Sequence, residues 1–326
     1  MTNNKYKVIY RYQRFTTRTV ESLVHDHLHF SDPTSFNDPF DCQPVVESDS
    51  DRETLRLILA ILIGRRIEAE SAASLKAAQV KGEKVVSYAK NLGEQVAKSK
   101  LQELSYHATN PEYECGIYEA ECWLLTSEIQ SELLKRYDRG VCCFSTIYNN
   151  PLLWSHYGDQ HKGLCIGYNL DRDPMPILRK VEYGGSRKVK TSLIGKALLN
   201  DDQNAQESLD RDVLLRKASM WRYEREWRLF GHKGVQDSVL ALKDITFGLR
   251  CPRAIMHSVI SALESRNGAI EFYEIFEVYG SFKLKRRPVD TSEMRAFLPH
   301  TAVSGIEMFG TCEENLFNDV NDSIKT

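Results

Sequence analysis

The chain has 326 residues, of which 42% are hydrophobic and 27% charged, and its 43 Lys and Arg nearly balance its 45 Asp and Glu. This composition is ordinary for a globular protein of one large domain or two modest ones, and it excludes binding to nucleic acid or membranes through global charge. The longest apolar run, Leu57 to Ile63, is far shorter than the roughly 20 residues that span a bilayer, so we expect no contact with a membrane.

The N-terminal residues and the cysteines both indicate the cytoplasm. The first seven residues lack the apolar stretch of a secretory signal. The eight cysteines form no Cys-x-x-Cys pair of the kind used in structural zinc sites, and we expect them to be reduced. His25, His27 and His29 straddle an expected helix-to-strand junction, so we do not expect them to share a metal ion.

The first elements are a strand, a helix and a second short strand. Lys7 to Phe15 alternates as a strand does, and Thr16 or Thr19 can cap the helix that follows. Leu28 to Ser31 is the second strand. The loop from Asp32 to Cys42 contains two prolines, and we expect the rings of its two phenylalanines to hold it against the body of the protein.

A change of composition at Asp51 predicts a helical insertion, which ends near Tyr106. It is rich in Ala, Leu, Ile, Lys and Glu, and apolar residues recur at helical spacing, as in Leu55, Ile58, Leu59 and Leu62. We interpret this region as two or three helices. A core domain of residues 1–50 and 107–290 surrounds it, and residues 291–326 form a loop-rich tail.

Strands and helices alternate irregularly through the rest of the core. The expected strands are Val141 to Ser145, Gly163 to Tyr168, Glu226 to Gly231, Leu242 to Phe247 and Phe272 to Leu284. The expected helices are Asn149 to Tyr157, entered through Asn150 and Pro151, then an exposed helical segment at Ser192 to Ser219, and His257 to Arg266.

The segment Trp221 to Arg228 carries two carboxylates between aromatic and basic residues. If it is extended, Glu224 and Glu226 share one face with Arg228. Carboxylates that close repel each other, so one of them should be partly protonated or tied to a cation. Such pairs occur at active sites and in structural ion-pair networks, and the sequence leaves both interpretations open.

Three blocks of residues resemble the signature of a bacterial family of unassigned function. They are Phe36-Asn37-Asp38-Pro39-Phe40-Asp41, Trp154-Ser155-His156-Tyr157 and Tyr223-Glu224-x-Glu226-Trp227-Arg228. More distantly, the order of elements is similar to the ADP-ribosyltransferase fold, including the toxins that modify DNA bases. In that fold a first strand contacts the nicotinamide dinucleotide, a loop covers it, and a late strand carries the catalytic glutamate.

This distant resemblance implies an α+β fold of split mixed or antiparallel sheets with an inserted helical subdomain. It implies NAD as substrate, no metal, and Glu226 as the catalytic carboxylate, with Glu224 second. The residues expected to bind the dinucleotide are Arg11, Tyr12, Ser31, Asn37, Asp38, Phe40, Trp154, His156 and Tyr157. The acceptor would be a nucleic acid or a protein. A toxin or phage-defence effector of this kind would have an antitoxin or defence-system partner.

Two other classes of function stay open at this point. A metal-dependent nuclease effector could use Asp38, Asp41, Glu224 and Glu226 as oxygen ligands, although no carboxylate-x-Lys pair accompanies them. A non-catalytic module could use the aromatic loop as a ligand pocket.

Overall fold

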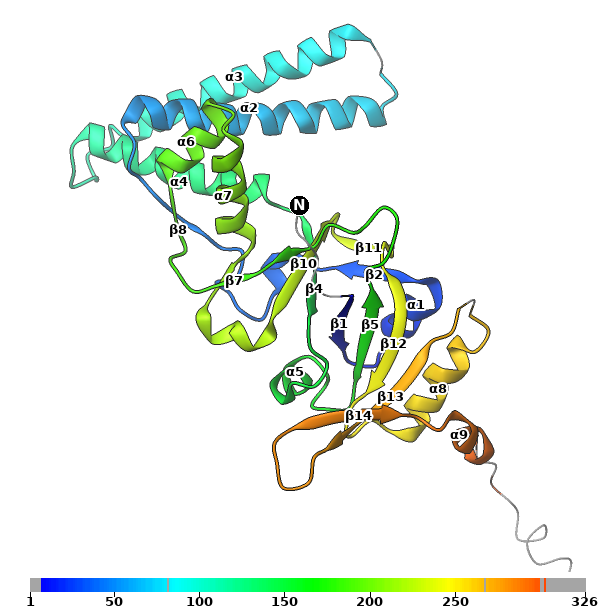
Figure 1. Ribbon diagram of the computed structural model, residues 1–326. Coiled ribbons are helices and arrows are strands. Elements are labelled where there is room, and N and C mark those ends of the chain that lie inside the picture. The colour runs from blue at the N-terminus through cyan, green and yellow to red at the C-terminus, as the bar shows by residue number, and fades with distance from the viewer. Residues whose placement is uncertain (1–6, 81, 267, 300–301, 303–326) are drawn as a thin grey trace, which may run out of the picture.

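The structure is a computed structural model that describes residues 7–80, 82–266, 268–299 and 302. It confirms the α+β class. A body built on one mixed sheet carries a set of long helices at one end (Figure 1). The sheet has the strand order β14-β13-β12-β5-β1-β4-β10-β6, and only β12 and β13 pair in parallel.

The strands of this sheet are β1 (Val8–Gln13), β4 (Gly140–Ser145), β5 (Leu164–Asn169), β6 (Arg179–Lys180), β10 (Glu226–Gly231), β12 (Ala241–Phe247), β13 (Glu271–Glu277) and β14 (Leu284–Pro288). Three small two-stranded sheets accompany it. They pair β2 (His27–Phe30) with β11 (Gly234–Asp237), β3 (Val45–Glu47) with β8 (Lys188–Lys190), and β7 (Glu182–Tyr183) with β9 (Arg216–Lys217).

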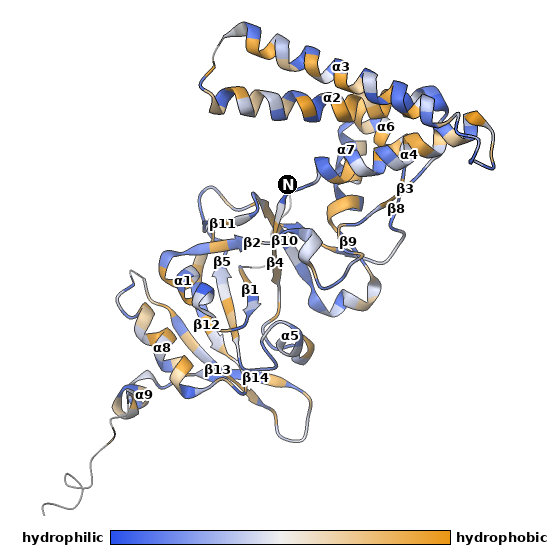
Figure 2. Cartoon of the chain, turned by 180° about the vertical axis from the view of Figure 1, so that it is seen from behind, coloured by the Kyte–Doolittle hydropathy of each residue, from blue (hydrophilic) through white to orange (hydrophobic). Residues whose placement is uncertain are grey.

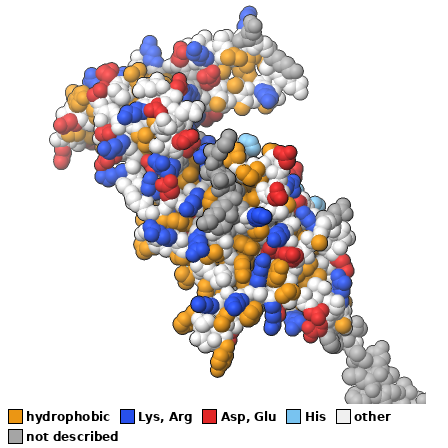
Figure 3. All heavy atoms as spheres, in the orientation of Figure 1, with side chains coloured by type: hydrophobic (Ala, Val, Ile, Leu, Met, Phe, Trp, Pro, Cys, Tyr) orange, Lys and Arg blue, Asp and Glu red, His pale blue; other side chains and the backbone are white. Residues whose placement is uncertain are grey.

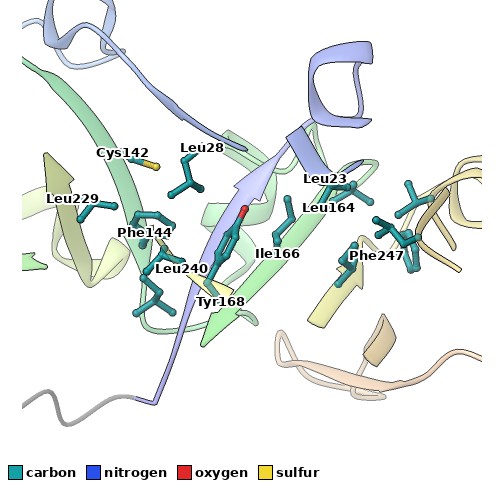
Figure 4. Packing of buried hydrophobic residues seen from close by; sticks show 14 of the residues in the cluster. Leu23, Leu28, Cys142, Phe144, Leu164, Ile166, Tyr168, Leu229, Leu240 and Phe247 are labelled. Carbon is teal, nitrogen blue, oxygen red and sulfur yellow. The ribbon is translucent and has the colours of Figure 1, made fainter. Parts of the chain in front are cut away.

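The central strand β5 is buried on both faces, which explains its nearly continuous apolar sequence. Leu164, Ile166 and Tyr168 belong to one core, together with buried residues of α1 (Thr17–His25) and α8 (Arg253–Leu263) (Figure 4). Cys165 faces the other way, toward Trp154 of α5 (Pro151–His156). The two faces of the sheet therefore have separate hydrophobic cores.

Local capping defines the short helices as the sequence predicted. The Thr16 side chain accepts a hydrogen bond from the backbone of Thr19 at the start of α1. Asn150 does the same for Leu152 at the start of α5, whose first residue is Pro151. These contacts involve residues two or three positions apart, so they can be predicted from the sequence.

The long helices form a further core of their own. They are α2 (Arg52–Ala77), α3 (Glu83–His107), α4 (Ile117–Arg136), α6 (Thr191–Leu199) and α7 (Gln203–Leu214), called here the helical module. Figure 2 shows hydrophobic residues where α2 meets α6 and α4. The module thus combines the consecutive helices α2, α3 and α4, the first of which begins inside the expected insertion, with α6 and α7 from much later in the chain.

Several expectations about individual elements were wrong. Residues 192–219 are largely helical as expected, but α6 and α7 are not exposed, because residues such as Ile194 and Leu209 are buried in the core to which α2 also contributes. The helices also continue past Tyr106, since α4 reaches Arg136. The single strand expected from Phe272 to Leu284 is a hairpin of β13 and β14, which turns at Gly280 with a φ of 70°.

The tail differs from the expected loop at its start. Asp290 caps a helix, α9 (Thr291–Phe297), and most of the remaining tail, including Cys312, lies outside the described residues. A 3-10 turn, η1 (Pro33–Ser35), interrupts the loop after β2. The cysteines in the described part of the chain are all free thiols. Of the helices described, none combines the length and hydropathy needed to cross a bilayer.

Leu59 and Leu57 of α2 provide a matched test of the core of the helical module. Leu59 is fully buried, whereas Leu57 is 56% exposed. Leu59→Ala should lower the free energy of unfolding by about 2–5 kcal/mol, because it removes packed methyl groups and leaves a cavity. Leu57→Ala should change it by no more than about 0.5 kcal/mol. Urea denaturation of both variants measures the difference, and equal losses would contradict the assigned packing of α2.

Candidate functional site

The strands β1, β4 and β10 lie side by side and bring the three polar sequence blocks together. Between them and the loop after β2 is a cavity of about 410 Å³, called here the acidic cavity. Its lining includes Arg11 and Tyr12 of β1, Ser31 and Asn37, His156 and Tyr157 of α5, and both Glu224 and Glu226. The first strand and the Glu226 strand therefore lie close together, with only β4 between them.

Lys217 of β9 lies where three carboxylates meet. Its Nζ donates to Glu224 Oε2 at 2.7 Å and to Glu226 Oε2 at 3.0 Å, and it lies 3.4 Å from Asp41 Oδ2. All four side chains are buried. The expectation that a cation would relieve the repulsion between the two glutamates is thus met, by a lysine that the sequence did not single out.

Arg228 is the second cation of the cluster and is completely buried. Its Nε donates to Glu226 Oε1 at 2.8 Å, and its Nη2 donates to Asp41 Oδ2 at 2.6 Å. Its Nη1 donates to the backbone carbonyl of Leu214, the last residue of α7, at 2.7 Å. The buried ion cluster of Asp41, Lys217, Glu224, Glu226 and Arg228 has three acids and two bases.

The two glutamates differ in their electrostatic state. Burial by itself would raise the pKa of Glu226, but Arg228 and Lys217 outweigh it and lower that pKa to about 2. For Glu224, burial prevails over Lys217 and the pKa is raised, with the charge of Glu226 acting in the same direction. Glu226 is therefore firmly ionised, whereas Glu224 accepts a proton more readily than an ordinary glutamate.

Tyr157 connects Glu224 to the loop after β2. Its hydroxyl donates to Glu224 Oε1 at 2.7 Å and accepts from Asn37 Nδ2 at 3.1 Å. Burial, followed by the charge of Glu224, raises the pKa of Tyr157, so it remains a donor over the physiological range. Both oxygens of Glu224 thus have fixed partners at the wall of the acidic cavity.

The prediction that Glu224 and Glu226 share one face required an extended segment, but the segment is not extended throughout. Ser219–Glu224 forms a 3-10 turn, η2, and Arg225 follows with a φ of 49° in the left-handed region. Strand β10 starts only at Glu226. Glu224 therefore reaches Lys217 from a turn, and Glu226 reaches it from the strand.

Buried carboxylates, more than rings, hold the loop after β2 in place. Asp41 is bound by Arg228, and Asp38 Oδ1 accepts from the backbone of Phe40 at 2.9 Å. Phe40 is 58% exposed, with the Arg187 guanidinium 4.5 Å from its ring centre. The expectation that Phe40 packs into the body was wrong, because an ion pair across the loop supplies the anchor.

Three of the residues predicted to bind a ligand do not line the acidic cavity. Asp38 turns back on its own loop and Phe40 lies outside. Trp154 is fully buried beneath Tyr12, with the ring centres 5.1 Å apart, and its Nε1 donates to the carbonyl of Tyr148. Trp154 therefore packs behind Tyr12, which lines the cavity.

A second cavity of about 540 Å³, called here the basic cavity, adjoins the first. The two share Arg11, Tyr12, Arg14, His156 and Tyr157. The basic cavity adds Arg18, His29 and the threonines at the start of α1. Burial, followed by the charges of Arg18 and Arg11, lowers the pKa of His29.

Sequence reasoning missed Lys217 and the arginines beyond Arg11. Lys217 follows an apolar helix end and belongs to no pattern, and Arg14 and Arg18 sit in a polar turn and helix start. The four carboxylates proposed as metal ligands do not share one centre, since Asp38 faces its loop and Lys217 Nζ lies among the other three. No group of three or more His, Cys, Asp or Glu within the described ranges could hold a metal ion.

Comparison with known proteins gives one match. A family described as a protein of unknown function, DUF2971, matches residues 153–229. This span begins within α5, covers η2 and reaches into β10, and it includes both glutamates and Lys217. The match agrees with a resemblance to a family of unassigned function. No curated protein and no solved structure matches the chain.

The buried ion cluster predicts unequal costs for removing its two glutamates. Glu226→Gln removes the carboxylate that pairs with both buried cations and should lower the free energy of unfolding by about 3–5 kcal/mol. Glu224→Gln should cost about 1.5–3 kcal/mol, the net value of a hydrogen bond to a charged group, since Glu224 contacts only one of the two cations. Denaturation at neutral pH compares them, and equal losses would contradict the division of roles.

The same cluster predicts how stability depends on acid. Because the folded-state pKa of Glu226 is lowered from 4.5 to about 2, its contribution is present above pH 4.5 and is lost as the pH falls toward 2. Unfolding curves recorded across this range should show a smaller acid-induced loss for Glu226→Gln than for the native chain. A parallel decline in both proteins would show that Glu226 is not held in its ionised form.

Proposed function

We propose that this protein is an NAD-consuming enzyme of the ADP-ribosyltransferase type, which breaks the bond between nicotinamide and ribose and transfers ADP-ribose to a macromolecule. The observation that carries the proposal is a pair of adjoining cavities. The first has the carboxylate of Glu224 fixed at its wall, and the second is lined by three arginines, two of which also line the first. A dinucleotide needs the same two environments.

The acidic cavity suits the reacting half of such a substrate. As the glycosidic bond breaks, positive charge develops on the ribose, and a fixed carboxylate stabilises it without having to reorganise. Tyr157 and Lys217 orient the two oxygens of Glu224. Tyr12, His156 and Tyr157 supply rings beside which the nicotinamide can lie.

Glu224 is a better candidate for this role than Glu226, which reverses the order expected from the sequence. Both oxygens of Glu226 are bound to cations, Oε1 to Arg228 and Oε2 to Lys217 and Arg228. Its charge is already compensated, so it would stabilise a developing positive charge on the substrate only weakly. Glu224 shares a single cation, Lys217, and its other partner is a neutral hydroxyl.

The basic cavity suits the pyrophosphate. Arg11, Arg14 and Arg18 present guanidinium groups, which bind phosphate oxygens in pairs of hydrogen bonds. Cavities of about 410 and 540 Å³ each have the size of ordinary ligand pockets. A ligand that bridges them would contact Arg11 and Tyr12 from both sides, because these residues line both cavities.

The transfer is balanced without an oxidant or a reductant. The electron pair of the C1′–N bond leaves with nicotinamide, whose ring becomes neutral. A lone pair of the acceptor forms the new bond to C1′, and the acceptor loses a proton to Glu224 or to water. A carboxylate whose pKa is raised is suited to receive that proton. Such a reaction would suit a toxin or defence effector that a partner protein keeps in check.

Replacing Glu224 tests this proposal. Glu224→Gln should lower the rate of nicotinamide release from NAD by about 10²–10³, because it removes one electrostatic stabiliser of the transition state. Glu207→Gln, an exposed glutamate of α7, is the matched control and should leave the rate unchanged. Chromatography of NAD reaction mixtures measures nicotinamide. A native chain that never consumes NAD, or a fully active and folded Glu224→Gln variant, would refute the proposal.

A further inference from the structure

A group of aromatic rings lies directly beside the acidic cavity. The ring centres of His156 and Trp221 are 6.3 Å apart, those of His156 and Tyr223 are 6.4 Å apart, and those of Trp221 and Tyr223 are 6.0 Å apart. Trp221 and Tyr223 belong to η2, the turn that ends at Glu224. His156 lines both cavities. This ring group is therefore part of the surface around the site.

The hairpin of β13 and β14 presents two more rings at its tip. Tyr279 is 100% exposed and Phe282 is 99% exposed, on either side of Gly280. Figures 1 and 2 place η2, α5 and this tip along the same side of the body. Asn149, next to the cap of α5, donates to the carbonyl of Leu284 at the start of β14. We call the ring group and the two tip residues the aromatic track.

Unpaired positive charges accompany these rings. Arg222, Arg225, Lys283 and Lys285 are all exposed, and within the described residues none has a carboxylate within 4 Å. Arg286 differs, because it is paired with Asp244. Figure 3 shows hydrophobic side chains projecting at the lower end of the body, with Lys and Arg side chains nearby. Free cations thus lie next to these rings in the chain, Arg222 and Arg225 by the ring group and Lys283 and Lys285 by the hairpin tip.

We infer that the aromatic track binds single-stranded nucleic acid and presents it to the site as the acceptor, an inference that rests on the proposed function. Exposed rings stack on bases of any sequence, and neighbouring cations follow the phosphates. A duplex keeps its bases stacked on one another and so hides them from the rings. A protein partner would favour a continuous apolar core with few charges, which this surface lacks.

The position of the track indicates how it would serve the reaction. Trp221 and Tyr223 precede Glu224 in one turn, and Arg225 follows it in a left-handed conformation with an exposed side chain. A base stacked on this turn therefore lies next to the acidic cavity. The hairpin tip would hold the strand farther away, so the two contacts fix its direction past the site.

Fluorescence anisotropy with the full chain and no NAD tests the inference. The probes are a labelled 15-nucleotide DNA strand, the RNA of the same sequence, and the DNA duplex. We expect a single strand to bind more tightly than the duplex, and Tyr279→Ala with Phe282→Ala to weaken its binding about tenfold or more. Lys283→Ala with Lys285→Ala should lower the slope of log affinity against log salt by about 1.4.

The controls change the same residue types on the helical module. Tyr106→Ala removes an exposed ring, and Lys84→Ala with Lys90→Ala removes two exposed charges, all from α3. These variants should bind as the native chain does. The inference is overturned if no single strand binds, if the duplex binds as well, or if controls and track variants weaken binding equally.

A second measurement separates this inference from the proposed function. Labelled NAD is offered together with the oligonucleotide or with a cell protein extract. Label on the oligonucleotide, lost in the track variants while nicotinamide release persists, supports the inference. Label on proteins alone overturns it and leaves the enzyme proposal standing. Strand binding without any NAD cleavage refutes the proposed function and with it the acceptor role.

Discussion

The burial of Arg228 is the constraint on which the rest of the structure depends. A fully buried guanidinium is tolerated only if its donors are all satisfied, because an unpaired charge in the interior is very costly. Its partners are its strand neighbour Glu226, the carbonyl of Leu214 at the end of α7, and Asp41, which lies 187 residues earlier in the chain. The loop after β2, the end of α7 and the edge of the sheet must therefore form together.

This constraint also shapes the candidate site. Three carboxylates surround two cations, so the cluster retains one uncompensated negative charge. The geometry assigns that charge to Glu224, which shares only Lys217 and faces the acidic cavity beside Tyr157. Arg11 and Arg14 line both cavities, and Arg18 lines the basic cavity. The pairing of the interior ions thus leaves one carboxylate beside a wall that carries arginines.

The helical module is joined to this arrangement by both of its chain segments. The first segment ends with α4, which leads directly into β4, the strand between β1 and β10. The second ends with α7, which leads into β9 and Lys217, while the carbonyl of Leu214 binds Arg228. A displacement of α7 would therefore disturb the hydrogen bond from Arg228 to Leu214, and with it the ion cluster. The module is connected to the site through hydrogen bonds as well as through the chain.

The sequence by itself determined the features that rest on short-range contacts. Strand β10, the caps at Thr16 and Asn150, and the meeting of the three polar blocks follow from alternation, capping and the ends of neighbouring strands. Only the tertiary structure decided that Lys217 joins the two glutamates, that Phe40 stays outside and that α6 and α7 share a core with α2. These outcomes depend on which distant residue compensates a buried charge or covers an apolar face. Local sequence patterns do not contain that information, because the stabilising energy comes from the interaction of two residues and not from either residue alone.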